Sequence, residues 1–308
     1  MTTPHPDLIP HRTRLPYDRP SRTDSLVVHT SWYLRPRGCA IIVLISTATV
    51  VLVGAVSQRM TGLGFSLVAA PLLTLMMGPF QGIVLANLLA LLVAVSVLAA
   101  SWREVDLRRA ATLVPFGLLG VFPGVWIART LPTGPLQTVI GLLTLLGLTG
   151  AIWRAVRTSA THNTSATDGT TRTDRTSGQA PGSAGVPDPH TVLTGLAGTA
   201  SGFMTATAGV GGPALTVYAL ATSWRQVGFA ATAQISFASQ AALALSLKGV
   251  QGLPDPVECT VLLAAAGVGL AFGHLLANRL PAKETRRALI VITVAGALAT
   301  TVKGALMW

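Results

Sequence analysis

Two short stretches decide how this chain folds: TGLGF at residues 61–65 and TAGVGGP at residues 207–213. Each places clustered glycines inside an otherwise apolar run. In a helix interior, glycine costs roughly 1 kcal/mol and proline about 3 kcal/mol relative to alanine. We therefore expect an apolar helix to break at each stretch.

The sequence around the two stretches is repeated. Gly62 and Asn87 in the first half correspond to Gly209 and Gln234 in the second. Further along, paired glycines and a Leu-Pro step recur in the same order in both halves. A duplicated apolar unit with glycine-interrupted segments at matching positions is typical of secondary transporters.

Composition places the chain in a membrane. Of its 308 residues, 50% are hydrophobic and 11% are charged, whereas a soluble domain carries about 25% charged residues. The net charge of +11 could indicate nucleic acid binding. The basic residues, however, gather in tails and short loops, as positive-inside topology requires. We expect a multi-pass plasma membrane protein whose partner is the lipid bilayer and not nucleic acid.

The chain divides into two apolar repeats separated by a polar segment. Residues 1–37 are predicted to be a disordered tail and 157–189, rich in Thr, Ser, Gly and Asp, a disordered linker. The transmembrane repeats span 38–156 and 190–308. Because the broken segments could be re-entrant, we expect an all-α fold of about eight to ten segments. Ten apolar runs lie at about 39–57, 62–78, 82–100, 110–130, 136–153, 191–206, 210–224, 227–247, 258–278 and 286–306.

Loop charges predict that the two repeats are inverted. The loop at 101–109 contains three arginines and its repeat at 249–257 has no basic residue. The loop at 131–135 is uncharged, whereas its repeat at 279–287 has four basic residues. Basic loops belong on the cytoplasmic side, so the halves are expected to have opposite orientations. Ten full crossings would then put the Arg-bearing tail outside, which leaves the number of crossings open.

The helix breaks predict a site for a small anion. A break inside a membrane is tolerated only within protein or beside a water-filled cavity, and it creates a helix N-terminus that attracts anions. Close helix packing is the other role of such glycines, but their pairing across the repeat favours binding. The predicted substrate-binding residues are Thr61, Gly62, Gly64, Asn87, Thr207, Gly209, Gly211, Gly212 and Gln234.

Asn87 and Gln234 supply the predicted side-chain amides. Each lies inside an apolar run, where an amide must be hydrogen-bonded and can donate to a bound oxyanion. An interhelical hydrogen bond without a substrate role is an equal alternative. Gln240, Ser236 and Ser239 are weaker candidates on the same segment as Gln234.

Two further patterns have structural interpretations. Gly120 with Gly124, and Gly269 with Gly273, form small-x-x-x-small pairs that predict helix packing. His274 could relay protons, but it has no counterpart in the first half, which favours a structural or interfacial role.

Several classes of protein are disfavoured by what the sequence lacks. It has no P-loop, no H-E-x-x-H motif and no credible Ser-His-Asp or Cys-His set. No apolar run carries an acidic residue near its centre. We therefore expect no enzyme, no cofactor and no metal, and a site that suits an anion.

The chain resembles the TauE/SafE, or sulfite exporter, family of membrane proteins. The resemblance covers about residues 39–306 without the linker. It rests on TGLGFSLVAAP from residue 61, on TAGVGGP and on WREVDLRR at 102–109. The first half lacks the denser G-x-G-G-G pattern of the family, so the second half has the fuller motif. The resemblance implies transport of sulfur-containing anions such as sulfite or organosulfonates, commonly outward across the plasma membrane.

These observations together predict an exporter of small anions that works by alternating access at a site between the repeats. An anion-permeable channel is the first alternative. A membrane scaffold whose tail and linker recruit partners is the second. The substrate, the coupling ion and the oligomeric state are not predicted.

Overall fold

The computed structural model describes residues 37–62, 64–164, 189–222, 224, 226–249, 253–277 and 282–307. The predicted tail and most of the predicted linker lie outside these residues, so both stay predictions. The chain divides into two units, Met1–Val43 and Leu44–Trp308. Only the first turns of one helix are described in the first unit, and the fold is that of the second.

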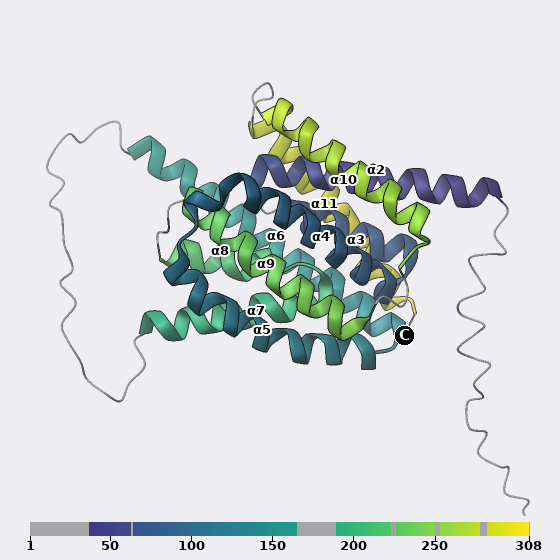
Figure 1. Ribbon diagram of the computed structural model, residues 1–308, viewed down its shortest axis with the longest axis horizontal. Helices are drawn as coiled ribbons and strands as arrows, with labels where there is room; N and C mark the ends of the chain where they lie inside the picture. Colours follow the sequence, from purple (N-terminus) through teal and green to yellow (C-terminus); the bar gives the residue numbers. More distant parts are fainter. Residues whose placement is uncertain are drawn as a thin grey trace, which may run out of the picture. The chain divides into compact units, whose positions relative to one another are not determined.

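The described residues form ten α-helices, each at the place of one predicted apolar run (Figure 1). The all-α prediction is thereby confirmed, and the five helices of one repeat correspond in order to the five of the other. The helices of the first repeat are α2 (Arg37–Thr61), α3 (Gly64–Met77), α4 (Pro79–Ser101), α5 (Leu107–Thr130) and α6 (Thr133–Thr164), with a 3-10 turn, η1 (Trp102–Glu104), after α4. Those of the second are α7 (Pro189–Ala208), α8 (Gly212–Ala221), α9 (Gln226–Lys248), α10 (Pro256–Ala277) and α11 (Ala282–Ala305).

Five of the described helices are long and apolar enough to span a membrane, whereas α3 and α8 are shorter. Helices α2, α4, α5, α6 and α10 contain stretches long and apolar enough to cross a membrane, which makes the chain a polytopic membrane protein. Helices α3 and α8 have 14 and 10 residues. At 1.5 Å per residue they cover roughly 21 and 15 Å, less than the ~30 Å hydrocarbon core. That the glycine breaks before them fall at membrane depth stays a prediction.

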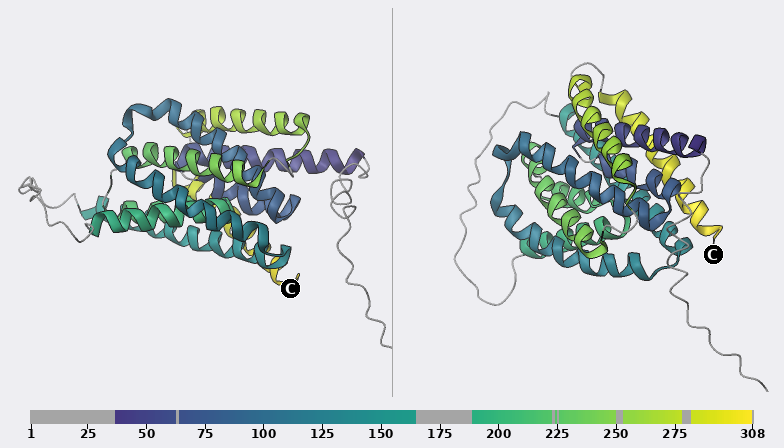
Figure 2. Two further views of the ribbon diagram at one scale, coloured as in Figure 1. Left: turned by 60° about the horizontal axis from the view of Figure 1, so that its bottom comes forward. Right: turned by 45° about the vertical axis from the view of Figure 1, so that its right-hand side comes forward.

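Glycines let α5 lie directly against α7, and the two helices run side by side in Figures 1 and 2. A Cβ on Gly120 would collide with the carbonyl of Thr199. One turn later, a Cβ on Gly124 would lie 2.7 Å from the carbonyl oxygen of Phe203. The packing role predicted for this glycine pair is confirmed.

Helix α10 packs on α2 in the matching way. A Cβ on Gly269 would lie 2.7 Å from the carbonyl oxygen of Leu52, and one on Gly273 would lie 3.1 Å from Cα of Val56. These contacts occupy the repeat positions that correspond to those of α5 on α7. The fourth helix of each repeat thus packs on the first helix of the other. The inversion of the repeats across the membrane stays a prediction.

Two helices of the first repeat pack against the corresponding helices of the second repeat. Helix α4 contacts α9, and α6 contacts α11. The N-terminal half of α4 is buried from Ile83 to Ala86, and that of α9 is buried at Ala231 and Ala233. The α4–α9 pair therefore brings Asn87 and Gln234, the predicted site amides, into the interior between the repeats.

Candidate functional site

The first break is closed by a glutamine side chain. Helix α2 ends at Thr61, and Gly62 turns the chain with φ +80°, a left-handed conformation that favours glycine. Gln58 spans the turn: its Nε2 donates to the Gly62 carbonyl (3.0 Å) and its Oε1 accepts from the Phe65 backbone N–H (3.0 Å). A side-chain oxygen therefore occupies the N-terminus of α3. The side chain of Thr61 lies outside the described residues.

The second break has no such closure. Gly209 turns the chain with φ +72°, and its N–H donates to the Thr205 carbonyl (3.0 Å). Gly211, which has no side chain to cap the helix, stands at the N-cap position of α8, and no other side chain among the described residues is found bonded to an N–H group of the first turn. The following Pro213 has no N–H to satisfy. Helix α8 therefore begins with an uncapped N-terminus.

Thr205 occupies the repeat position of Gln58 but makes different contacts. Its hydroxyl lies 2.8 Å from the Ser201 carbonyl and 3.0 Å from Oε1 of Gln240. Ser201 also bonds this amide oxygen (3.2 Å) and donates to the Gly211 carbonyl (2.9 Å). Buried hydrogen bonds with Ser201 and Gln240 thus hold the Thr205 hydroxyl beside the second break. At the first break, the corresponding side chain is the carboxamide of Gln58.

Each of the two predicted amide side chains lies at the glycine break of the other repeat, an arrangement that we call exchanged. Gln234, on α9 of the second repeat, donates from Nε2 to the Gly62 carbonyl of the first break (3.1 Å). Its Oε1 lies 3.4 Å from Nε2 of Gln58. Asn87, on α4 of the first repeat, lies at the second break, where a Cβ on Gly209 would be 3.8 Å from its Oδ1. Each repeat therefore places its amide at the glycine break of the other.

The exchanged amides differ in their hydrogen bonding. Both side chains are fully buried. Gln234 is bonded, whereas neither amide atom of Asn87 has a partner among the described residues. An unsatisfied buried polar group costs about 1–3 kcal/mol, and native proteins normally supply a partner through protein, water or a ligand. Asn87 therefore offers hydrogen-bonding capacity beside the second break.

A small hollow lies between the two breaks. Its volume is about 20 Å³, and a single water needs about 10–15 Å³. None of the described residues that line it is acidic. Its walls are Gln58, Phe65 and Ser66 beside the first break, Thr205 and Gly209–Gly212 at the second, Ala90, Val93 and Ala94 from α4, and Gln234, Phe237 and Ala241 from α9.

The predicted site residues divide into three groups. Gly209, Gly211, Gly212 and Gln234 line the hollow. Gly62 and Gly64 lie at the first break and Asn87 adjoins the second, but none of the three lines the hollow. Thr207 is buried, and its hydroxyl donates to the Phe203 carbonyl of its own helix (2.7 Å). Whether these residues bind substrate stays a prediction.

Sequence reasoning missed Gln58 and Thr205. Both lie one turn before a glycine break, at equivalent repeat positions, and both line the hollow. The available signal was a polar side chain inside an apolar run, the same signal that identified Asn87 and Gln234. His274 is exposed, with Nδ1 3.5 Å from Nη2 of Arg59, and it is not part of the hollow.

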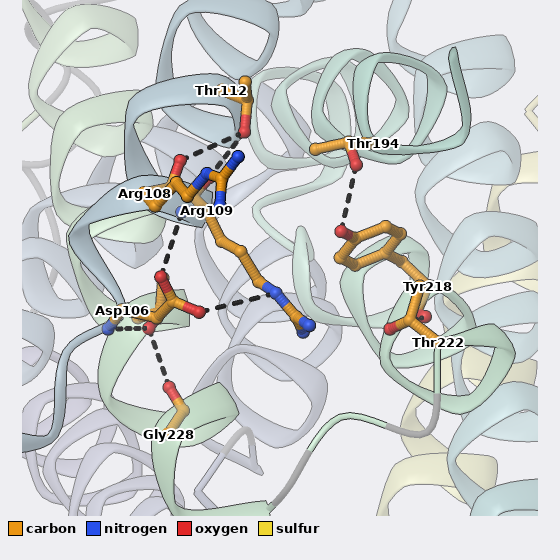
Figure 3. Close-up of polar contacts among 9 residues, drawn as sticks. Asp106, Arg108, Arg109, Thr112, Thr194, Tyr218, Thr222 and Gly228 are labelled. Atoms are coloured by element: carbon orange, nitrogen blue, oxygen red, sulfur yellow. Dashed lines mark hydrogen bonds and ion pairs between the residues drawn. The ribbon is translucent and has the colours of Figure 1, made fainter. Parts of the chain in front are cut away.

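A polar cluster fixes the starts of α5 and α9 at one end of the helix bundle (Figure 3). Asp106 caps α5 by accepting from the Arg109 N–H (3.2 Å), and its Oδ2 lies 3.4 Å from Nε of Arg109. The Asp106 N–H donates to the Thr232 hydroxyl on α9 (3.0 Å). The Arg109 guanidinium lies over the Trp224 ring, 4.4 Å from its centroid. The predicted cytoplasmic loop is thereby attached to both repeats.

Comparison with known proteins gives one family. The family model described as Sulfite exporter TauE/SafE matches residues 47–300. The matched region includes both glycine breaks, the hollow and the polar cluster at the start of α5. Searches of curated proteins and of solved structures found no match.

Proposed function

Because the chain belongs to the sulfite exporter TauE/SafE family of membrane transporters, we propose that it exports a small sulfur-containing anion, such as sulfite or an organosulfonate. Anion export is the activity of the family. The identity of the substrate, the use of alternating access and the position of the site at the second break are the parts we add. Neither a cofactor nor an enzymatic step enters the proposal.

The observation that carries the proposal is the uncapped N-terminus of α8 at the hollow. Gly211 and Gly212 line the hollow, and no side chain competes for the first turn of the helix. A helix N-terminus stabilises a nearby anion by about 0.3–1 kcal/mol, and by up to about 2 kcal/mol when partly buried. Among the described residues that line the hollow, none is a carboxylate that would repel the anion.

The size of the hollow supports alternating access over a channel. Its volume of about 20 Å³ holds about one water, and an ion with three oxygens around a sulfur is larger. Entry of an anion would therefore require the hollow to widen, as movement of one repeat against the other would allow. Movement of one repeat against the other would act directly on the exchanged contacts of Gln234 with Gly62 and of Asn87 with Gly209.

The test is Gly211→Leu, studied as flux of radiolabelled sulfite in proteoliposomes. A Cβ at Gly211 collides with the Thr205 hydroxyl and lies 3.0 Å from the Ser201 carbonyl. We expect flux to fall to the level of empty liposomes while the protein still inserts and elutes as a folded species. The matched control is Gly267→Leu on α10, where a Cβ meets nothing within 4 Å; it should transport like the unchanged protein.

Normal flux in Gly211→Leu would refute the site at the second break. Transport of neither sulfite nor an organosulfonate by the unchanged protein would refute the substrate class. Accumulation of the anion against its gradient distinguishes the transporter from a channel, which would instead give single-channel currents and no accumulation.

A further inference from the structure

Lys248 is a buried cation that the proposed site does not use. It is the last residue of α9 and is 2% exposed. Its Nζ donates to the carbonyl of Ala206 (2.5 Å), in the last turn of α7 directly before the second break. That carbonyl is available because the N–H of Val210 donates to Met204 instead (3.3 Å). The ammonium therefore lies beside the second break, at the end of α7.

A second cation lies next to Lys248. Nη2 of Arg129, in the last turn of α5, donates to the carbonyl of Leu247 (2.6 Å), the residue before Lys248. Neither cation makes an ion pair with a carboxylate of the described residues. Burial, and secondarily the charge of Arg129, lower the pKa of Lys248 to about 7, because a buried charge is costly unless it is paired and two neighbouring cations repel each other. An anion at this place would relieve both costs.

Capping a helix end does not by itself account for this arrangement. Lys303 caps the end of α3 in the same way, with Nζ donating to the Leu75 carbonyl (3.0 Å). Lys303, however, is only partly buried. Among the described residues, no second cation bonds a carbonyl next to Lys303 in the way that Arg129 bonds the Leu247 carbonyl next to Lys248. Full burial and a like-charged neighbour distinguish Lys248 from a lysine that serves only as a cap.

Lys248 and Arg129 lie on one side of the hollow, at the ends of α9 and α5. Helices α5 and α9 begin together, where Asp106 contacts Thr232, and end together, where Arg129 contacts Leu247. Ala241, midway between, lines the hollow. The loop before Asp106 is the predicted cytoplasmic loop. Lys248 and Arg129 therefore lie toward the opposite face, beyond the hollow.

We propose that Lys248 and Arg129 form a second anion site, the exit site, which binds the small oxyanion after it leaves the hollow. This inference rests on the proposed export function. A bound anion would favour the protonated form of Lys248 next to the second break, and the exposed guanidinium of Arg129 extends the positive charge to the surface. Such a site lowers the energy barrier to release, because its positive charge stabilises the anion while the anion leaves the N-terminus of α8.

The experiment is calorimetric titration of sulfite into the purified full-length chain in detergent. Loss of a hydrogen bond to a charged group costs enough to weaken binding roughly ten- to hundredfold. We expect Lys248→Met to remove one component of sulfite binding and Gly211→Leu to remove another. Lys303→Met, the matched control, should keep both components. Lys248→Arg should retain the exit component because arginine stays charged.

The outcomes separate the two proposals. Loss of all sulfite binding in Gly211→Leu with no change in Lys248→Met overturns the exit site and leaves the site at the second break intact. Loss of sulfite binding in Lys248→Met with no change in Gly211→Leu overturns the site at the second break and leaves the exit site intact. A folded Lys248→Arg protein without the exit component overturns the role of charge and points to proton transfer by lysine. If Lys248→Met does not fold, Arg129→Gln must show the same loss in weaker form, and unchanged binding there contradicts the exit site.

Discussion

The two glycine breaks have the same backbone design and different chemistry. At the first, Gln58 caps α3, and Gln234 from the other repeat bonds the turn. At the second, no described side chain caps α8, and Asn87 from the other repeat has no hydrogen-bond partner within the described part of the chain. The first break is therefore internally satisfied, whereas the second retains capacity for a ligand.

The difference indicates which of the two glycine breaks is available to an anion in a pseudo-symmetric molecule. An anion at the N-terminus of α3 would compete with the Gln58 oxygen for the Phe65 N–H. At α8 the corresponding side chain is Thr205, whose hydroxyl is held by Ser201 and Gln240. Our proposal therefore assigns anion binding to the second break and a contact between the repeats to the first. The predictions below break or sharpen this contrast.

The exchanged amides should give the largest contrast, with opposite signs for stability. Gln234→Leu removes a bond to the Gly62 carbonyl and should lower the free energy of unfolding by about 1–3 kcal/mol. Asn87→Leu removes an unsatisfied amide and should leave stability equal or higher, while sulfite affinity falls. Thermal unfolding in detergent and sulfite titration measure both. A clear loss of stability in Asn87→Leu would show that the amide has a protein partner.

The next contrast compares the two residues before the breaks. Gln58→Met keeps the side-chain length but removes the cap of α3, which should cost about 0.5–2 kcal/mol of stability. Thr205→Val keeps the shape but removes the hydroxyl, which should weaken sulfite binding roughly tenfold with a smaller change in stability. Equal effects of both changes on sulfite affinity would contradict the division of roles.

The smallest effect is expected at Thr207. Its hydroxyl donates to the carbonyl of Phe203 within α7, and it does not line the hollow. Thr207→Val should therefore change the sulfite KM of transport by less than about twofold, because a bond that only repeats the helix pattern contributes little. A large rise in KM would place this hydroxyl on the substrate path and widen the site.

The fold was predictable because its causes are local. Glycine clusters such as those at Gly62 and Gly209 weaken a helix locally, and apolar runs of sufficient length become membrane helices. The packing of Gly120 and Gly269 followed from a spacing of one helical turn. These features require no knowledge of which helices meet.

The site was only partly predictable because its contacts are long-range. The sequence pairs Asn87 with Gln234 but does not show that each amide crosses to the other repeat. The cap formed by Gln58 depends on a side-chain conformation across the turn. The orientation of Thr207 toward its own helix depends on its position on the helix face. Packing between the repeats decides all three.

The most direct measurement is the position of a selenite ion, the selenium analogue of sulfite, located by anomalous diffraction from crystals of the full-length chain. The selenium signal should lie at the N-terminus of α8, with its oxygens about 3 Å from the N–H groups of Gly211 and Gly212. A signal at the N-terminus of α3 beside Phe65, or none in the hollow with the ion bound elsewhere, would contradict the assignment of the second break as the anion site.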